Sequence, residues 1–149
     1  MIKLIAIVGC VLSAVLPCRR AYAQEACQLP GSGAFRQNPP GSVRVRPIFA
    51  RGEVDSLGLY GGWINILPAG SVAEHVHIEG DEILWAVCGS AKVVVDGREV
   101  ELKEGGSLRI PRDVRHAATA GPRGVVAVQV YRPGGPGLRF YDWSEHQKP

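Results

Sequence analysis

The chain has 149 residues, of which 46% are hydrophobic, with 17 basic and 14 acidic residues and a formal net charge of +3. This length and composition are those of a protein with one hydrophobic core, and they exclude a charged, apolar-poor disordered chain. The small net charge gives no indication of nucleic-acid binding.

Residues 1–23 have the features of a secretory signal peptide. Lys3 supplies a positive charge, an apolar run extends from Leu4 to Leu16, and Ala21-Tyr-Ala23 forms an A-x-A cleavage site. The apolar run is shorter than the roughly 20 residues of a membrane span. We therefore expect cleavage after Ala23, a periplasmic or secreted protein, and no stable membrane insertion. Cleavage removes three basic residues and no acidic ones, which takes the formal net charge from +3 to 0.

Residues 24–42 are rich in Gly, Pro, Ser and Gln, which predicts a poorly ordered, flexible N-terminal arm. The arm contains Cys27, and Cys88 is the other cysteine that remains after cleavage. In an oxidising compartment the two either form a disulfide or stay as free thiols, with Cys88 buried as a small apolar side chain. The sequence does not set the distance between their sulfur atoms, so both alternatives stay open.

The rest of the chain predicts an all-β protein. Short segments of alternating apolar and polar residues are separated by Gly and Pro, and no segment has the apolar periodicity and caps of a helix. Asp96-Gly97 is the favoured two-residue hairpin turn. Residues 51–58 are polar and predict a turn. The expected strands are 42–47 (an edge strand that Pro47 stops), 59–67, the histidine segment, 82–87, 92–95, 98–102, 107–110, 115–120 and 125–131.

The tail, residues 134–149, follows a cluster of Gly and Pro residues and contains Phe140, Tyr141 and Trp143. Such aromatic residues indicate either a tail that packs on its own domain or on a partner, or a frayed terminus with incidental aromatics.

The segment from Gly70 to Gly89 contains the most informative pattern. His75 and His77 are two residues apart, so on a strand both side chains project from one face. The four residues after His77 can turn the chain and bring Glu82 back beside the histidines on the next strand. Two imidazoles and one carboxylate are ligands typical of a transition-metal site, and His116 offers a fourth.

Other polar and aromatic residues have weaker indications. Glu79 has the same parity as the histidines and would replace Glu82 if the turn bulged differently. Arg109 and Arg115 either bind a substrate carboxylate or are surface charges. Three aromatic residues either line the mouth of a barrel or pack elsewhere: Tyr60, Trp63 and Tyr131.

The two segments resemble the signature motifs of the cupin superfamily, G-x5-H-x-H-x3-4-E-x6-G and G-x5-P-x-G-x2-H-x3-N. The chain departs from them at Gly70, which is one residue closer to the histidine pair, at Asp113 in place of Gly, and at Ala120 in place of Asn. None of these departures removes a metal ligand. The matching positions are His75, His77, Glu82 and Gly89 in the first motif and Gly105, Pro111 and His116 in the second.

The resemblance implies a double-stranded β-helix, or jelly-roll barrel, over residues 43–133. It implies one divalent metal ion inside the barrel, with His75, His77, Glu82 and His116 as ligands. Three imidazoles and one carboxylate suit Fe or Mn, and also Ni, Co or Zn. If Glu82 points inward, Trp85 points outward between aliphatic neighbours, and by analogy with cupin dimers we expect a homodimer that covers it.

Four protein ligands leave about two positions open on an octahedral ion, where a substrate can bind. The resemblance therefore implies a metal-dependent enzyme, a dioxygenase or a related lyase or isomerase, that acts on a small oxygenated metabolite. The alternatives are a non-catalytic periplasmic cupin that binds a small molecule or sugar, and a metal-storage or stress protein. The fold alone does not decide among them.

Overall fold

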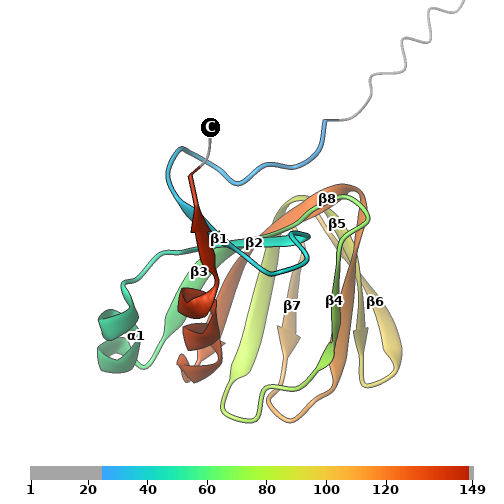
Figure 1. Ribbon diagram of the computed structural model, residues 1–149. Coiled ribbons are helices and arrows are strands. Elements are labelled where there is room, and N and C mark those ends of the chain that lie inside the picture. Colours follow the sequence, from blue (N-terminus) through green and yellow to red (C-terminus); the bar gives the residue numbers. More distant parts are fainter. Residues whose placement is uncertain (1–24, 148–149) are drawn as a thin grey trace, which may run out of the picture.

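A computed structural model of the protein describes residues 25–147 of the chain, so the predicted signal peptide and its cleavage site lie outside the described residues. Figure 1 shows strands that wrap into a barrel, with two helical segments at one side. The elements in chain order are β1 (Phe35–Gln37), β2 (Val43–Pro47), α1 (Arg51–Leu57), β3 (Tyr60–Ile66), β4 (Ser71–His75), β5 (Asp81–Val95), β6 (Arg98–Lys103), β7 (Ser107–Ile110), β8 (His116–Arg132), η1 (Gly135–Asp142, a 3-10 helix) and β9 (Ser144–His146).

The strands form one antiparallel sheet in the order β6-β5-β8-β3-β2-β1-β9, with β4 paired to β8 and β7 paired to β5. This arrangement is a jelly-roll β-barrel, which confirms the predicted fold class. The Asp96-Gly97 hairpin is also confirmed, because both residues have positive φ, 49° and 75°, as the favoured hairpin turn requires.

Two long strands close the barrel. β5 has 15 residues and β8 has 17, and each was predicted as two shorter strands. Gly89 and Gly124 have positive φ, and the register of β5 against β8 shifts on either side of Gly89. Glycine therefore bends these strands instead of ending them. The first part of β8 pairs with β4 and its last part pairs with β3, so this one strand is hydrogen-bonded to both.

The core lies inside the barrel, on alternate residues of each strand. Along β5, Glu82 and Ala86 are buried, whereas Ile83, Trp85 and Val87 are exposed. The predicted inward orientation of Glu82 is therefore confirmed. The inner faces of the other strands carry mainly aliphatic residues, among them Val43, Val45, Ile64, Ile66, Val93, Leu102, Ile110, Val125 and Ala127.

The sequence predicted no helix, but residues 51–57 form α1. Its first turn is held by Glu53, whose carboxylate accepts a 2.6 Å hydrogen bond from the Ala50 N–H. Gly58 ends the helix in the left-handed region, with φ 60°. Seven residues are too few to show helical periodicity, and Val54 is the one buried side chain in the helix, so the polar composition concealed it.

The N-terminal arm is more ordered than its composition predicted. It contains β1, which pairs with β2 on one side and β9 on the other, so β2 is not an edge strand. Cys27 forms a disulfide with Cys88, with 5.8 Å between the Cα atoms. The arm also accepts hydrogen bonds from Arg46 of β2 through the carbonyls of Pro30, Gly33 and Ala34. These partners lie far away in sequence, and local composition cannot reveal them.

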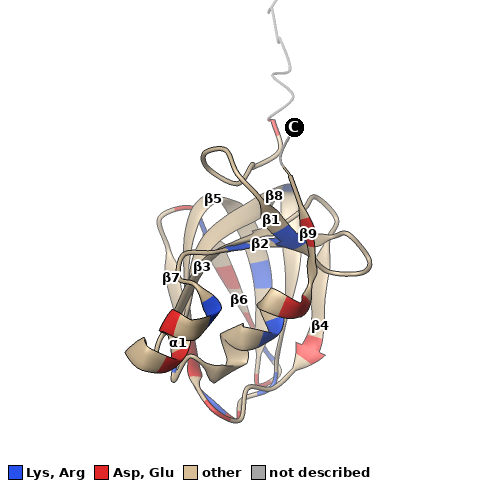
Figure 2. Ribbon diagram, turned by 60° about the vertical axis from the view of Figure 1, so that its left-hand side comes forward, with Lys and Arg blue, Asp and Glu red and all other residues tan. Residues whose placement is uncertain are grey.

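The tail packs on its own barrel. Phe140 of η1 is 2% exposed and lies 5.5 Å from Tyr60 and 5.0 Å from Trp143, measured between ring centroids. Arg51 of α1 and Asp142 of η1 form a 2.8 Å ion pair. Figure 2 shows α1 and η1 next to each other, with charges of both signs interspersed over the strands and helices. No helix within residues 25–147 has the length and apolar character to cross a membrane.

Candidate metal centre

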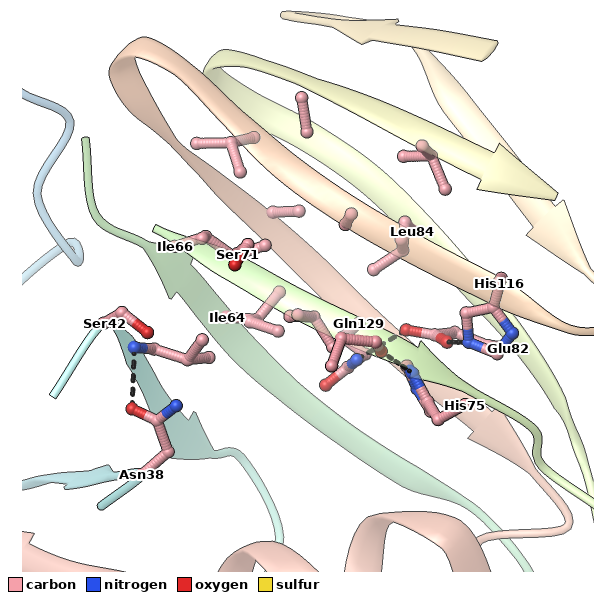
Figure 3. Close-up of a pocket in the computed structure, with 18 of the residues that line it drawn as sticks. Asn38, Ser42, Ile64, Ile66, Ser71, His75, Glu82, Leu84, His116 and Gln129 are labelled. Atoms are coloured by element: carbon pink, nitrogen blue, oxygen red, sulfur yellow. Dashed lines mark hydrogen bonds and ion pairs between the residues drawn. The ribbon is translucent and has the colours of Figure 1, made fainter. Parts of the chain in front are cut away.

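Three elements and one loop bring the four predicted ligands together. His75 is the last residue of β4 and lies opposite His116, the first residue of β8. His77 follows β4 in the loop to β5, where Glu82 is the second residue. One possible ligand atom from each of these side chains lies within 4.8 Å of the others. Figure 3 shows His75, Glu82 and His116 converging at one end of the cavity.

Backbone carbonyls orient two of the imidazoles. The Nδ1 of His75 lies 2.9 Å from the Ala73 carbonyl, and the Nδ1 of His116 lies 2.9 Å from the Val114 carbonyl. Since a carbonyl accepts, each Nδ1 carries the proton and donates it. The Nε2 atom of both rings is then unprotonated in the neutral imidazole and available as a metal ligand.

A buried polar atom tests whether this cluster suits a cation. The Nε2 of His116 is buried and makes no hydrogen bond, and it lies 3.3 Å from Oε2 of Glu82. A neutral Nε2 and a carboxylate oxygen are both acceptors, so their close approach is unfavourable unless a proton or a metal ion lies between them. The same Glu82 oxygen lies 3.1 Å from Nε2 of His77. The donor set of imidazole nitrogens and carboxylate oxygen fits a divalent first-row metal.

The pKa values of His75 and Glu82 shift in the directions that favour metal ligation, whereas the pKa of His116 shifts in the opposite direction. Burial lowers the pKa of His75 to about 4, which keeps this imidazole neutral. Burial alone would raise the pKa of Glu82, but contacts with His116 and His77 and a hydrogen bond from Gln129 outweigh it and hold this pKa below the ordinary value. Burial likewise opposes the charged form of His116, but the Glu82 carboxylate raises the pKa of His116 overall.

The cluster lies at one end of a cavity of about 540 Å³ inside the barrel. Figure 3 shows aliphatic side chains, including Ile64, Ile66 and Leu84, along the length of the cavity beside the polar end. Gln129 donates hydrogen bonds to Glu82 and, over 2.9 Å, to the Tyr131 hydroxyl. Burial raises the pKa of Tyr131 well above its ordinary value, so its hydroxyl stays neutral. A fixed polar end and an apolar body are typical of small-molecule sites.

The alternative candidates lie elsewhere. Glu79 is exposed and is not a member of the cluster. Arg109 pairs with Asp81 at 2.6 Å, and Arg115 pairs with Glu74 at 3.3 Å, both on the surface. Of the three aromatics, Tyr131 lines the cavity, Tyr60 is a fully buried core residue, and Trp63 is half-buried outside the cavity lining.

Sequence reasoning missed two residues of the polar end, Gln129 and Arg139. Gln129 lies on β8 and is 3% exposed. The one sequence signal that could have found Gln129 is its polar amide within an otherwise apolar strand. Arg139 lies on η1, and no motif marked it.

Comparison with known proteins agrees with this geometry. Residues 62–131 match the family model described as Cupin domain. The chain belongs to the cupin superfamily. Its fold is similar to that of KdgF from Halomonas sp., with a TM-score of 0.59 and 17% identity over 66% of this chain and 84% of that one. It is also similar to an RmlC-like cupin from Shewanella frigidimarina, with a TM-score of 0.57 and 19% identity over 75% of this chain and 93% of that one.

Among curated proteins, this cupin is similar to the tetracenomycin polyketide synthase protein TcmJ of Streptomyces glaucescens. The two are 34% identical over 72 residues, which is 48% of each chain. It is also similar to protein SchB of Streptomyces halstedii, with 29% identity over 86 residues, 56% of this chain and 62% of that one. The aligned region thus spans about half of TcmJ and less than two thirds of SchB.

Proposed function

We propose that this cupin is a metal-dependent enzyme that acts on a small oxygenated metabolite. One divalent ion, Fe or Mn in the first place and otherwise Ni, Co or Zn, is held by His75, His77, Glu82 and His116. The observation that supports this most directly is the convergence of four possible ligand atoms within 4.8 Å of one another, in which the buried Nε2 of His116 lies 3.3 Å from a carboxylate oxygen of Glu82. A cation would satisfy both atoms.

A bound ion supplies Lewis-acid or redox chemistry to a substrate oxygen. The residues around it have separate tasks. The amide of Gln129 holds Glu82 in position. The carbonyls of Ala73 and Val114 fix two of the imidazoles. The aliphatic walls of the cavity keep water from the substrate, which strengthens polar interactions at the metal.

The proposed reactions are dioxygenation, or a related lyase or isomerase step. The name of the Streptomyces glaucescens relative associates that protein with polyketide synthesis, and polyketides are oxygen-rich carbon compounds. This supports a small oxygenated substrate for the present chain. The cavity of about 540 Å³ has room for a substrate of that kind.

The first experiment measures metal in protein purified without added metal or chelator. We expect nearly one equivalent in the wild type and loss of most of it in His75→Ala and His116→Ala. Even outer partners of ligands change metal affinity by about 10- to 100-fold, and a ligand itself contributes more. His146→Ala is the matched control, because His146 is exposed on β9, outside the cluster. Unchanged metal in both ligand variants contradicts the site.

A second measurement addresses turnover. Oxygen uptake with small enolisable substrates supports a dioxygenase, whereas product formation without oxygen uptake supports a lyase or isomerase. Metal-loaded protein that binds such compounds but converts none of them supports the non-catalytic binding protein instead. Tight metal binding with no affinity for small molecules supports the storage alternative.

We also propose that the protein is exported, periplasmic or secreted. The Cys27–Cys88 disulfide supports this, since such bonds persist in oxidising compartments. N-terminal sequencing of the protein from the extracytoplasmic fraction should begin at Gln24. Protein that is found in the cytoplasm and begins at Met1 contradicts the proposal.

A further inference from the structure

Arg139 places a positive charge beside the candidate metal centre, and its position is fixed by η1. On one side, Phe140 is buried against Tyr60. On the other, the guanidinium of Arg36 donates to the carbonyls of Tyr141 and Trp143 at 2.9 and 3.2 Å. The helix that carries Arg139 is therefore anchored at the barrel end that contains the ligands.

Arg139 is an exposed residue that lines the cavity at its polar end. Its Nη2 donates to the Tyr131 hydroxyl at 3.3 Å, and its Nη1 lies 3.4 Å from Nδ1 of His77. The guanidinium carbon is 4.8 Å from the centroid of the Phe140 ring. An aromatic face of this kind orients a guanidinium without consuming its N–H donors.

No carboxylate in the described part of the chain forms an ion pair with Arg139. Four of the eleven described arginines form one, Arg36, Arg51, Arg109 and Arg115, and Arg139 is among the seven that do not. The polar contacts of Arg139 are to a tyrosine hydroxyl and an imidazole, and neither carries a negative charge to neutralise it.

The charge of the proposed holo site makes this arrangement informative. A divalent ion carries +2, the Glu82 carboxylate −1 and Arg139 +1, which leaves an excess of positive charge at the end of an apolar cavity. An excess of positive charge beside a low-dielectric wall attracts an opposite charge. An anionic group of a ligand would supply that charge, and a guanidinium binds a carboxylate through two parallel hydrogen bonds.

We propose that Arg139 binds a carboxylate of the substrate, so that the substrates of this cupin are small carboxylic acids with an apolar body. The acid lies at the polar end, between Arg139 and the metal ligands, and the body extends along the aliphatic walls. This inference rests on the proposed function, because it places the carboxylate at the mouth of the metal centre. Arg139 is in these terms a specificity-determining residue.

The test measures binding of acid and amide pairs to the metal-loaded full chain by calorimetry. The probes are acetate, benzoate and 3-phenylpropanoate, each with its neutral amide. We expect the larger acids to bind better than their amides. Arg139→Gln should weaken acid binding about tenfold to hundredfold, the range for a charge-assisted hydrogen bond, and leave the amides unchanged. Arg139→Lys should restore much of the acid affinity because it keeps the charge.

Lys103→Gln is the matched control. This variant removes one positive charge at the end of β6. Lys103 lies opposite Ser90 at one end of the β5–β6 ladder, whereas Val95, at the other end of that ladder, lies opposite His116. The variant should leave acid binding unchanged. Equal acid affinity in wild type and Arg139→Gln, or acids that bind no better than amides, overturns the assignment. Metal content is measured on every sample, so that failure of the metal centre itself is recognised separately.

Discussion

Glu82 is a carboxylate with 4% exposure and polar contacts at both oxygen atoms. Oε2 faces His77 and His116, and Oε1 accepts from Gln129. A buried carboxylate with this many polar neighbours stays ionised. Removal of one neighbour should lower the free energy of unfolding, because the buried charge loses part of its compensation. The cluster therefore contains a fixed negative charge, which would attract a cation.

The lowered pKa of His75 predicts a titration that can be measured in metal-free protein. Its folded-state pKa is about 4, whereas an unfolded chain has the ordinary value of 6.5. The unfolded chain thus binds the proton first as pH falls, so the contribution of His75 to the free energy of unfolding is complete above pH 6.5 and is lost as pH falls towards 4. NMR of the imidazole, assigned with His75→Gln, should give a midpoint near pH 4; a midpoint above 6 contradicts this.

The convergence of His75, His77 and Glu82 could be predicted from the sequence because their spacing on adjacent strands is a local property. His116, 34 residues after Glu82, was placed beside them by the resemblance to the cupin motifs. The other polar residues could not be predicted. Gln129 meets Glu82 across 47 sequence positions, and Arg139 meets His77 across 62. Only the paths of β8 and η1 through space bring these side chains to the site, and no local pattern encodes those paths.

At the scale of elements, the same distinction holds. Alternating strands and the Asp96-Gly97 turn were predicted, because strand periodicity and turn chemistry are local. The continuity of β5 and β8 through Gly89 and Gly124 was missed, since a glycine that bends a strand and one that ends it look alike in sequence. The sequence also did not show that β1 pairs with β9, because each strand has three residues.

The Cys27–Cys88 disulfide fastens the N-terminal arm to β5 and should contribute to stability. It joins residues 61 positions apart. Replacement of both cysteines by serine should lower the free energy of unfolding by about 2–4 kcal/mol, because the unfolded chain gains freedom. Urea unfolding measures this, with reduced wild type as the control that should match the variant. Free thiols in the unreduced mature protein would contradict the disulfide.

At the scale of the whole molecule, the outer face of β5 carries exposed apolar residues. Ile83, Trp85 and Val87 are 44, 56 and 45% exposed. We propose that a second copy of the chain covers this face, which supports a homodimer. Light scattering should give twice the mass of the mature chain, and Trp85→Lys should give the single mass. Leu57→Lys on α1, with 55% exposure in the wild type, is the control that should stay dimeric. A monomeric wild type contradicts the proposal.

The pairing of β1 with β9 has a consequence for the order in which the protein matures. Arg36 and Glu145 form an ion pair across 109 sequence positions, beside the helix that carries Arg139. This end of the cavity is therefore not complete until residues 144–146 are available to pair with β1. We propose that an exported chain completes this end of the cavity, and binds its metal, after it has crossed the membrane. The metals available in that compartment, not those of the cytoplasm, would determine which ion this barrel encloses.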